Sequence, residues 1–269
     1  MLFYSRILFS LLIKNVFPFA ATCLLLSLLS CGFQKQAIVC SDFSIGEITA
    51  KSFDSIDEND IFSTLAQMDI ITKDGYYPAR AALIIKRPLY LRLELLPVIG
   101  VPDFFLAAKP EKMSVLIPSR GEFYSGRPTG SNMKKFLPWP IELEDVIMIL
   151  TGTYPDFKEK DVFYQEYREN NLLRLDMKAP SGCSQIIWIG ENNKLLKLVR
   201  RDEQGRELYN VKYIYDENDG AFPENITISM ADGITSLSVK YSDVKIEETN
   251  DLSIFDLTIP ANVKLILLE

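Results

Sequence analysis

The stretch LYLRLELLPVIGVPDFF, residues 89–105, contains the two features from which the fold can be predicted. Its first half alternates leucines with Tyr90, Arg92 and Glu94, a period of two that is typical of an antiparallel strand with one buried face. Its second half keeps apolar residues in a turn bracketed by proline and glycine, although turns are normally polar. The apolar turn needs a partner, and two are open: another element of this chain, or a lipid or protein surface.

The same alternation recurs further along the chain. It is found at residues 172–178, 207–215, 225–230 and 235–241, and turn signals such as KDG, GENN, DEQG and DENDG separate these segments. Many short strands with turns of this kind predict an antiparallel barrel or a curved sheet.

The segment PIELEDVIMILTG, residues 140–152, breaks the β pattern. Leu143, Val146, Ile147 and Leu150 follow the spacing i, i+3, i+4 and i+7, which predicts a helix with an apolar stripe. A proline at residue 140 suits a first turn and a glycine at residue 152 suits a helix end. The helix is expected either to pack on the sheet or to form a lid over an apolar cavity inside it.

The N-terminal residues read as an export signal. Arg6 and Lys14 precede an apolar run that ends at Cys31, and residues 28–31, Leu-Leu-Ser-Cys, resemble a bacterial lipobox whose cysteine receives lipid. An uncleaved anchor helix is the alternative, because the run nearly reaches the length of a membrane span. We expect a signal peptide at 1–30, an N-terminal tether at 31–60 and one domain at 61–269.

Composition excludes several classes of function. Cleavage before Cys31 leaves 27 basic residues against 36 acidic ones, so binding to nucleic acid is not expected. The chain has no histidine, which removes Ser-His-Asp and Cys-His catalysis and every metal site that needs histidine. The acidic pairs, such as Glu142/Glu144 and Asp216/Glu217, stand in polar turns or at an exposed helix start, where solvated surface charge is the ordinary explanation. We therefore expect no enzyme, no catalytic residue, no metal and no cofactor.

Two cysteines remain once Cys23 leaves with the signal and Cys31 takes lipid. These are Cys40 and Cys183. An oxidising compartment would allow them to form a disulfide, but two separate thiols are equally compatible with the sequence.

Three short segments resemble one family. Residues 96–100, Leu-Pro-Val-Ile-Gly, stand where LolB-type receptors carry a turn with a protruding apolar residue. Residues 138–143 lead into a helix ending at 149–152, as in the same receptors, and residues 255–260 look like their closing strand. Over about residues 62–260 the chain is similar to the LolA/LolB-like superfamily, most closely to LolB-type outer-membrane lipoprotein receptors and related lipoproteins.

The resemblance implies a fold class that is mainly β with a few helices: an incomplete antiparallel β-barrel or curved sheet that encloses an apolar cavity with a helical lid. It implies a membrane-anchored lipoprotein whose cavity binds acyl chains and which receives lipoproteins from a LolA-type periplasmic carrier. Val98 and Ile99 would form the turn that contacts membrane or cargo. The candidate cavity and lid residues are Leu91, Leu93, Phe105, Leu116, Leu143, Val146, Ile147 and Leu150.

Localisation and the alternative function follow from the same features. Gly32 rather than aspartate follows the lipidated cysteine, which favours the outer membrane, facing the periplasm, as the place of the anchor. The alternative is a non-enzymatic envelope assembly or sensor module that uses the same fold, and its apolar turn, for contact with another protein.

Overall fold

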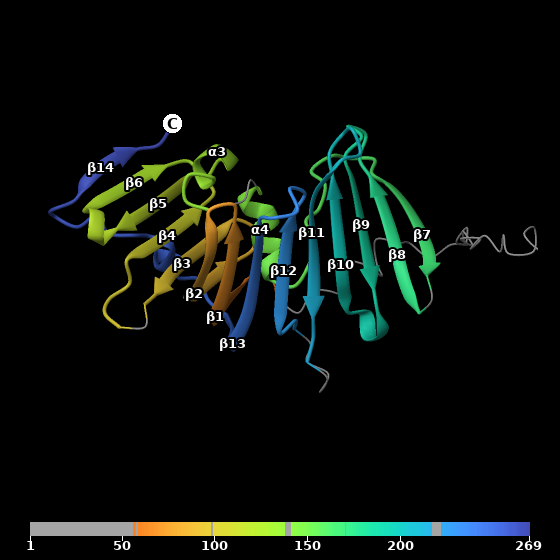
Figure 1. The fold of residues 1–269 in the computed structure, drawn as a ribbon, viewed down its shortest axis with the longest axis horizontal. Coiled ribbons are helices and arrows are strands. Elements are labelled where there is room, and N and C mark those ends of the chain that lie inside the picture. The colour runs from red at the N-terminus through yellow and green to blue at the C-terminus, as the bar shows by residue number, and fades with distance from the viewer. Residues whose placement is uncertain (1–55, 58, 98, 138–140, 170, 217–221) are drawn as a thin grey trace, which may run out of the picture. The chain divides into compact units, whose positions relative to one another are not determined.

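This computed structural model describes residues 56–57, 59–97, 99–137, 141–169, 171–216 and 222–269. Within them, fourteen strands form one sheet in the order β14-β6-β5-β4-β3-β2-β1-β13-β12-β11-β10-β9-β8-β7 (Figure 1). The order is linear, so the curved sheet does not close on itself. The predicted mainly β class with an incomplete barrel is confirmed.

The strands are antiparallel to their neighbours, except that β14 runs parallel to β6. Their bounds are β1 Asp60–Thr72, β2 Gly75–Lys86, β3 Tyr90–Leu96, β4 Phe104–Lys109, β5 Lys112–Ile117, β6 Glu122–Gly126, β7 Phe163–Glu169, β8 Leu172–Lys178, β9 Ser184–Ile189, β10 Leu195–Arg201, β11 Glu207–Ile214, β12 Asn225–Met230, β13 Ser236–Glu248 and β14 Lys264–Leu267.

The two longest strands, β1 and β13, lie together in the middle of the sheet. β1 pairs with β2 on one side and with β13 on the other, and each of β1 and β13 has 13 residues. A strand from the start of the domain therefore joins one from near its end. A register shift between Ser63 and Leu65 interrupts the β1–β13 ladder, and such irregularities increase local bending and twist.

The strand β3 has the predicted alternation. In β3, Leu91 and Leu93 are buried, while Arg92 and Glu94 on the other face are half-buried. β8 and β12 also occupy the predicted residues. One face of the sheet thus carries a nearly continuous apolar layer, and this layer is the core of the domain.

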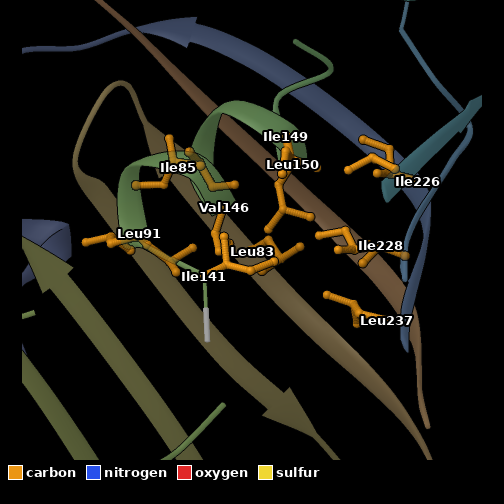
Figure 2. Packing of buried hydrophobic residues seen from close by; sticks show 14 of the residues in the cluster. Leu83, Ile85, Leu91, Ile141, Val146, Ile149, Leu150, Ile226, Ile228 and Leu237 are labelled. Atoms are coloured by element: carbon orange, nitrogen blue, oxygen red, sulfur yellow. The ribbon is translucent and has the colours of Figure 1, made fainter. Parts of the chain in front are cut away.

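The described residues include two α-helices, α3 (Gly130–Met133) and α4 (Leu143–Leu150), and three 3₁₀ turns, η1 (Pro118–Arg120), η2 (Glu191–Asn193) and η3 (Ser253–Phe255). α4 is the predicted amphipathic helix, and Gly152, at φ +79°, follows its C-terminal end. Figure 2 shows Val146, Ile149 and Leu150 of α4 directed toward apolar side chains of β2, β3, β12 and β13. The helix therefore contributes to the core rather than standing beside it.

The predicted closing strand at 255–260 is wrong. Residues 253–255 form the turn η3, and residues 256–260 have no strand structure. Side chains of β3 hold this segment against the outer face of the sheet: Arg92 Nη1 donates to the Ile254 carbonyl at 2.6 Å, and the rings of Tyr90 and Phe255 are 5.3 Å apart. The segment covers one face of the sheet, and the strand that follows it in the chain is β14.

The predicted signal peptide, its alternative anchor helix, Cys31, Cys40 and most of the predicted tether lie outside the described residues. Within the described part of the chain, no helix combines the length and the apolar character that crossing a membrane requires. Cys183 is half-buried and has no disulfide partner among the residues that the structure describes.

Candidate functional site

The turn between β3 and β4 projects apolar side chains into solvent. Ile99 is 90% exposed and Val101 is 79% exposed. Gly100 between them has φ +103°, a conformation that side-chain-bearing residues rarely adopt. The sequence left two partners open for this turn: another element of the chain, or a lipid or protein surface. The exposure of Ile99 shows that this side chain is not buried against another element of the chain. Val98, the other predicted contact residue, lies outside the described residues.

The far end of this turn is fixed by a carboxylate. Asp103 accepts hydrogen bonds from the backbone N–H of Ser119 at 2.6 Å and from its hydroxyl at 2.5 Å. These two bonds lower the pKa of Asp103 because they stabilise its ionised form. These bonds hold the residue before β4 against η1. The exposed apolar side chains of Ile99 and Val101 therefore project from a turn whose C-terminal end is fixed in place.

An open groove of about 650 Å³ lies beside the turn. It forms where β3 separates from β2: β2 begins at Gly75, but its pairing with β3 begins only at Arg80, opposite Leu96. Its lining consists of Gln67, Pro78, Ala79, Arg80, Leu95, Leu96, Pro97, Asp103 and Phe104. The volume is in the usual range of small-molecule sites.

The predicted lid residues meet the predicted sheet residues on one face. Leu143, Val146, Ile147 and Leu150 of α4 are at most 3% exposed, and Leu91 and Leu93 of β3 are at most 4% exposed. All six belong to one cluster of buried residues. The apolar side of α4 therefore covers the inner face of the sheet.

Two predicted lining residues lie on the other face of the sheet. Phe105 pairs with Glu94 and with Leu116, whereas Leu106 pairs with Leu93. Because partners across a ladder share a face, Phe105 and Leu116 belong to the outer face with Glu94. Phe104 and Ile117 take the inner positions, and both pack against the core. The structure therefore does not bring Phe105 and Leu116 together with the other six candidates.

A buried arginine fastens the C-terminal end of α4. Arg87 is 5% exposed, and its Nε and Nη2 atoms donate to the hydroxyl and the carbonyl of Thr151 at 2.9 and 3.0 Å. Its Nη1 atom donates to the Ile56 carbonyl at 3.0 Å. A cation at this position also complements the negative end of the helix dipole. Arg87 thus joins the helix end to the segment that precedes β1.

Tyrosine hydroxyls from the sheet add further attachments. Tyr241 of β13 donates to the Leu150 carbonyl at 2.9 Å, and Tyr213 of β11 donates to the Thr153 carbonyl at 2.7 Å. Burial raises the pKa of both hydroxyls, so they stay protonated and able to donate. The end of α4 is therefore held from three directions by polar bonds within an otherwise apolar interior.

A third tyrosine reaches the start of the helix. Tyr209 of β11 donates to Asp145 Oδ2 at 3.0 Å. Burial raises the pKa of Asp145, although the charge of Arg200 and the bond from Tyr209 oppose that rise. Arg200 in turn donates to Gln185 Oε1 at 2.9 Å, and Gln185 donates to the Pro155 carbonyl at 3.0 Å. This polar network extends the attachment to the segment that follows α4.

Solved structures share this arrangement of a curved sheet. A LolA superfamily protein from Nitrosomonas europaea superposes with a TM-score of 0.56 at 16% identity, over 80% of this chain and 99% of that chain. The fold is that of the LolA superfamily. A domain from Vibrio parahaemolyticus, named for outer-membrane lipoprotein sorting, gives 0.53 at 11% identity, over 78% of this chain and 94% of that one.

A third match is a DUF1329 family protein from Desulfovibrio piger, with a TM-score of 0.51 at 12% identity, over 78% of this chain and 93% of that chain. Comparisons with protein-family models and with curated proteins find no match. At these identities the likeness establishes the LolA-like fold and leaves activity to be argued from the site.

Sequence reasoning missed the residues that hold α4 on the LolA-like sheet. Arg87 is 64 residues from Thr151, and Tyr241 is 91 residues from Leu150. The period of residues 207–215 predicts a strand, but nothing local shows that the Tyr209 and Tyr213 hydroxyls reach α4 and the segment after it. Within the described residues, no group of three or more His, Cys, Asp or Glu side chains is placed to hold a metal ion.

Proposed function

We propose that this chain is a lipid-anchored protein of the bacterial cell envelope that binds acyl chains on the inner face of its sheet. In the full proposal it sits in the outer membrane facing the periplasm, receives lipoproteins from a LolA-type carrier, and inserts them into the membrane. It acts by binding and not by catalysis, and Cys31 carries the anchor. The chain's lack of histidine supports a non-catalytic role.

The exposure of Ile99 carries this proposal. A large apolar side chain that is 90% exposed on a fastened turn leaves solvent favourably when it enters a membrane, by about 1.5–3 kcal/mol for a residue of this size. Val101 adds to the same tip. A solvent-exposed apolar turn on a LolA-like sheet is consistent with the delivery of an acylated lipoprotein to a bilayer.

The inner face supports acceptance of acyl chains if α4 moves. The helix contributes apolar residues to the core, but Arg87 and the tyrosines hold its ends by hydrogen bonds, which can be exchanged for water one at a time. Opening would expose the apolar faces of α4 and β3, and an acyl chain would cover them again at about 25 cal/mol per Å² of apolar surface. Cargo and lid would thus compete for one surface.

The names of two similar structures agree with this class of function. One is a LolA superfamily protein, and the other is named for outer-membrane lipoprotein sorting. We extend that role to this chain as a proposal that rests on fold and on the turn together.

Transfer of an acylated lipoprotein from a LolA-type carrier tests the proposal. The full chain, in phospholipid vesicles, is compared with Ile99→Glu and with the matched control Ile259→Glu, which changes an apolar side chain that is 52% exposed elsewhere. We expect the parent and the control to deliver lipoprotein to the vesicles. Ile99→Glu should still accept cargo but deliver it about tenfold less.

Anchoring at Cys31 has its own test. Cells that express the chain are labelled with an acyl-chain precursor, and Cys31→Ala is compared with Cys183→Ala. Label that is lost only from Cys31→Ala supports the anchor. Label that persists in Cys31→Ala would overturn it.

The second candidate is an envelope assembly or sensor module. The burial of the α4 underside favours it, because a covered interior suits a scaffold whose apolar turn contacts another protein. A parent chain that neither accepts lipoprotein nor retains any acyl lipid would leave this candidate in place of the first.

A further inference from the structure

The groove beside the exposed turn is lined by one cationic side chain, Arg80, and by the polar side chains of Gln67 and Asp103. In the sheet register Gln67 of β1 pairs with Arg80 of β2, and Arg80 pairs with Leu96 of β3, so the three lie in one row. Arg80 and Gln67 are both exposed and both line the groove. Neither side chain has a hydrogen-bond or ion-pair partner among the described residues.

Two carboxylates near this row are already occupied. Asp103, which lines the groove, accepts two hydrogen bonds from Ser119. Asp69, next but one to Gln67 on β1, accepts a hydrogen bond from the Tyr76 hydroxyl at 2.5 Å. Asp103 therefore weakens the field of Arg80 without neutralising its guanidinium by direct contact. Five N–H donors in the planar geometry that suits phosphate remain available.

The rest of the groove is apolar. Leu96 lines it from the face that carries Arg80, whereas Leu95 and Phe104 line it from the inner face, where they also pack against the core. All three are half-buried. The same turn that supplies Pro97 to the groove carries Ile99 at its tip. A cationic group, an apolar wall and an exposed apolar tip thus lie together at one end of the β2–β3 pair.

We propose that this groove binds one membrane phospholipid with an anionic headgroup. The Arg80 guanidinium donates to the headgroup phosphate, the Gln67 amide supplies a further donor, and an acyl chain lies along Leu95, Leu96 and Phe104. The inference rests on the proposed function, because it places the turn at a membrane. It adds the class of lipid that is recognised there.

The charge of the chain makes local recognition necessary. With 36 acidic and 29 basic residues, the protein as a whole is repelled by an anionic surface. General adhesion by charge therefore does not account for binding to such a surface. A single arginine in an apolar groove supplies the attraction at the point where Ile99 enters the bilayer.

Native mass spectrometry of the full chain tests this site. The chain is held in neutral maltoside micelles that contain equal amounts of phosphatidylglycerol and phosphatidylcholine, with no carrier and no lipoprotein present. We expect the parent to retain phosphatidylglycerol about tenfold more than phosphatidylcholine. Both phosphates can accept from Arg80, but the choline cation of phosphatidylcholine repels the guanidinium, and phosphatidylglycerol has no such cation. Arg80→Gln should lose this preference, Arg80→Lys should keep part of it, and Leu96→Ser should weaken retention of both lipids.

Arg168→Gln is the matched control, because Arg168 is also exposed and has no partner among the described residues. It should retain the preference in full. Equal retention of the two lipids by the parent, or a preference that survives in Arg80→Gln, would overturn the inference. Complete displacement of phosphatidylglycerol by millimolar inorganic phosphate would also overturn it, because the ligand would then be a soluble phosphate.

The outcome is distinguishable from a failure of the proposed function. A parent that transfers lipoprotein but shows no lipid preference overturns only the phospholipid site. A parent that prefers phosphatidylglycerol but transfers no lipoprotein overturns only the receptor role.

Discussion

The turn at 97–101 and the helix α4 are both apolar and both bounded by glycine or proline, yet they lie in opposite environments. Ile99 is 90% exposed, whereas Ile147 is 0% exposed. The difference lies in what each segment meets. α4 reaches the inner face of the sheet and is held there by Arg87 and the tyrosines, whereas the turn extends beyond Leu96. Apolar character alone therefore does not tell a core from a contact surface.

The largest contrast should come from the same truncation in the two segments. Ile147→Ala removes fully buried atoms and should lower the free energy of unfolding by about 2–5 kcal/mol. Ile99→Ala should change it by less than about 0.5 kcal/mol, because the side chain is exposed. Urea unfolding measures both. Similar losses in the two variants would mean that Ile99 is covered in solution.

Loss of the arginine that holds the end of α4 should have the next largest effect. Arg87→Met leaves the carbonyls of Thr151 and Ile56 without their donor, which should cost about 1–3 kcal/mol. Amide hydrogen exchange over residues 143–150 should also become faster, because opening of the helix becomes easier. Arg168→Met is the exposed control. Unchanged exchange in Arg87→Met would show that Arg87 does not hold α4.

A smaller loss should follow removal of one tyrosine hydroxyl. Tyr241→Phe deletes the bond to the Leu150 carbonyl and should cost about 1 kcal/mol. Tyr77→Phe changes a ring that is 49% exposed and should have almost no effect. Thermal unfolding of the parent, Tyr241→Phe and Tyr77→Phe measures the two shifts in Tm. Equal shifts would contradict the attachment of α4 through Tyr241.

The smallest effect should appear as a pH dependence. Burial raises the pKa of Asp145 above its ordinary value of 3.8, so the folded state binds this proton more tightly than the unfolded state. The stability that Asp145 contributes is therefore present at low pH and is lost as the pH rises through its folded pKa. As the pH rises through this range, the free energy of unfolding of Asp145→Asn should increase relative to that of the parent. A constant difference between the two chains at all pH values would contradict this.

The strands and the helix could be predicted from the sequence because each has a local period. Residues 172–178 and 225–230 alternate, and both segments are strands with the predicted bounds. α4 follows a period of 3.6 and falls inside the predicted segment. The exposed tip at Ile99 could also be anticipated, as one of two alternatives, from apolar residues in a turn.

The assignment of Phe105 and Leu116 could not be made from local pattern. β4 begins with two adjacent phenylalanines and β5 ends with Leu116 and Ile117, so alternation does not choose which member of each pair faces inward. The pairing of Leu93 with Leu106 makes that choice, and a shift of one residue would reverse it. The attachments of α4 escaped prediction for the related reason that they join residues far apart in the chain.

The most direct test of the account measures the amide exchange of α4 while the full chain receives an acylated lipoprotein. We predict that residues 143–150 lose protection when cargo is bound, because acyl chains displace the helix from β3, while the ladder between β1 and β13 keeps its protection. If lipoprotein is accepted and α4 remains as protected as before, the cargo does not enter beneath the helix, and the central claim is wrong.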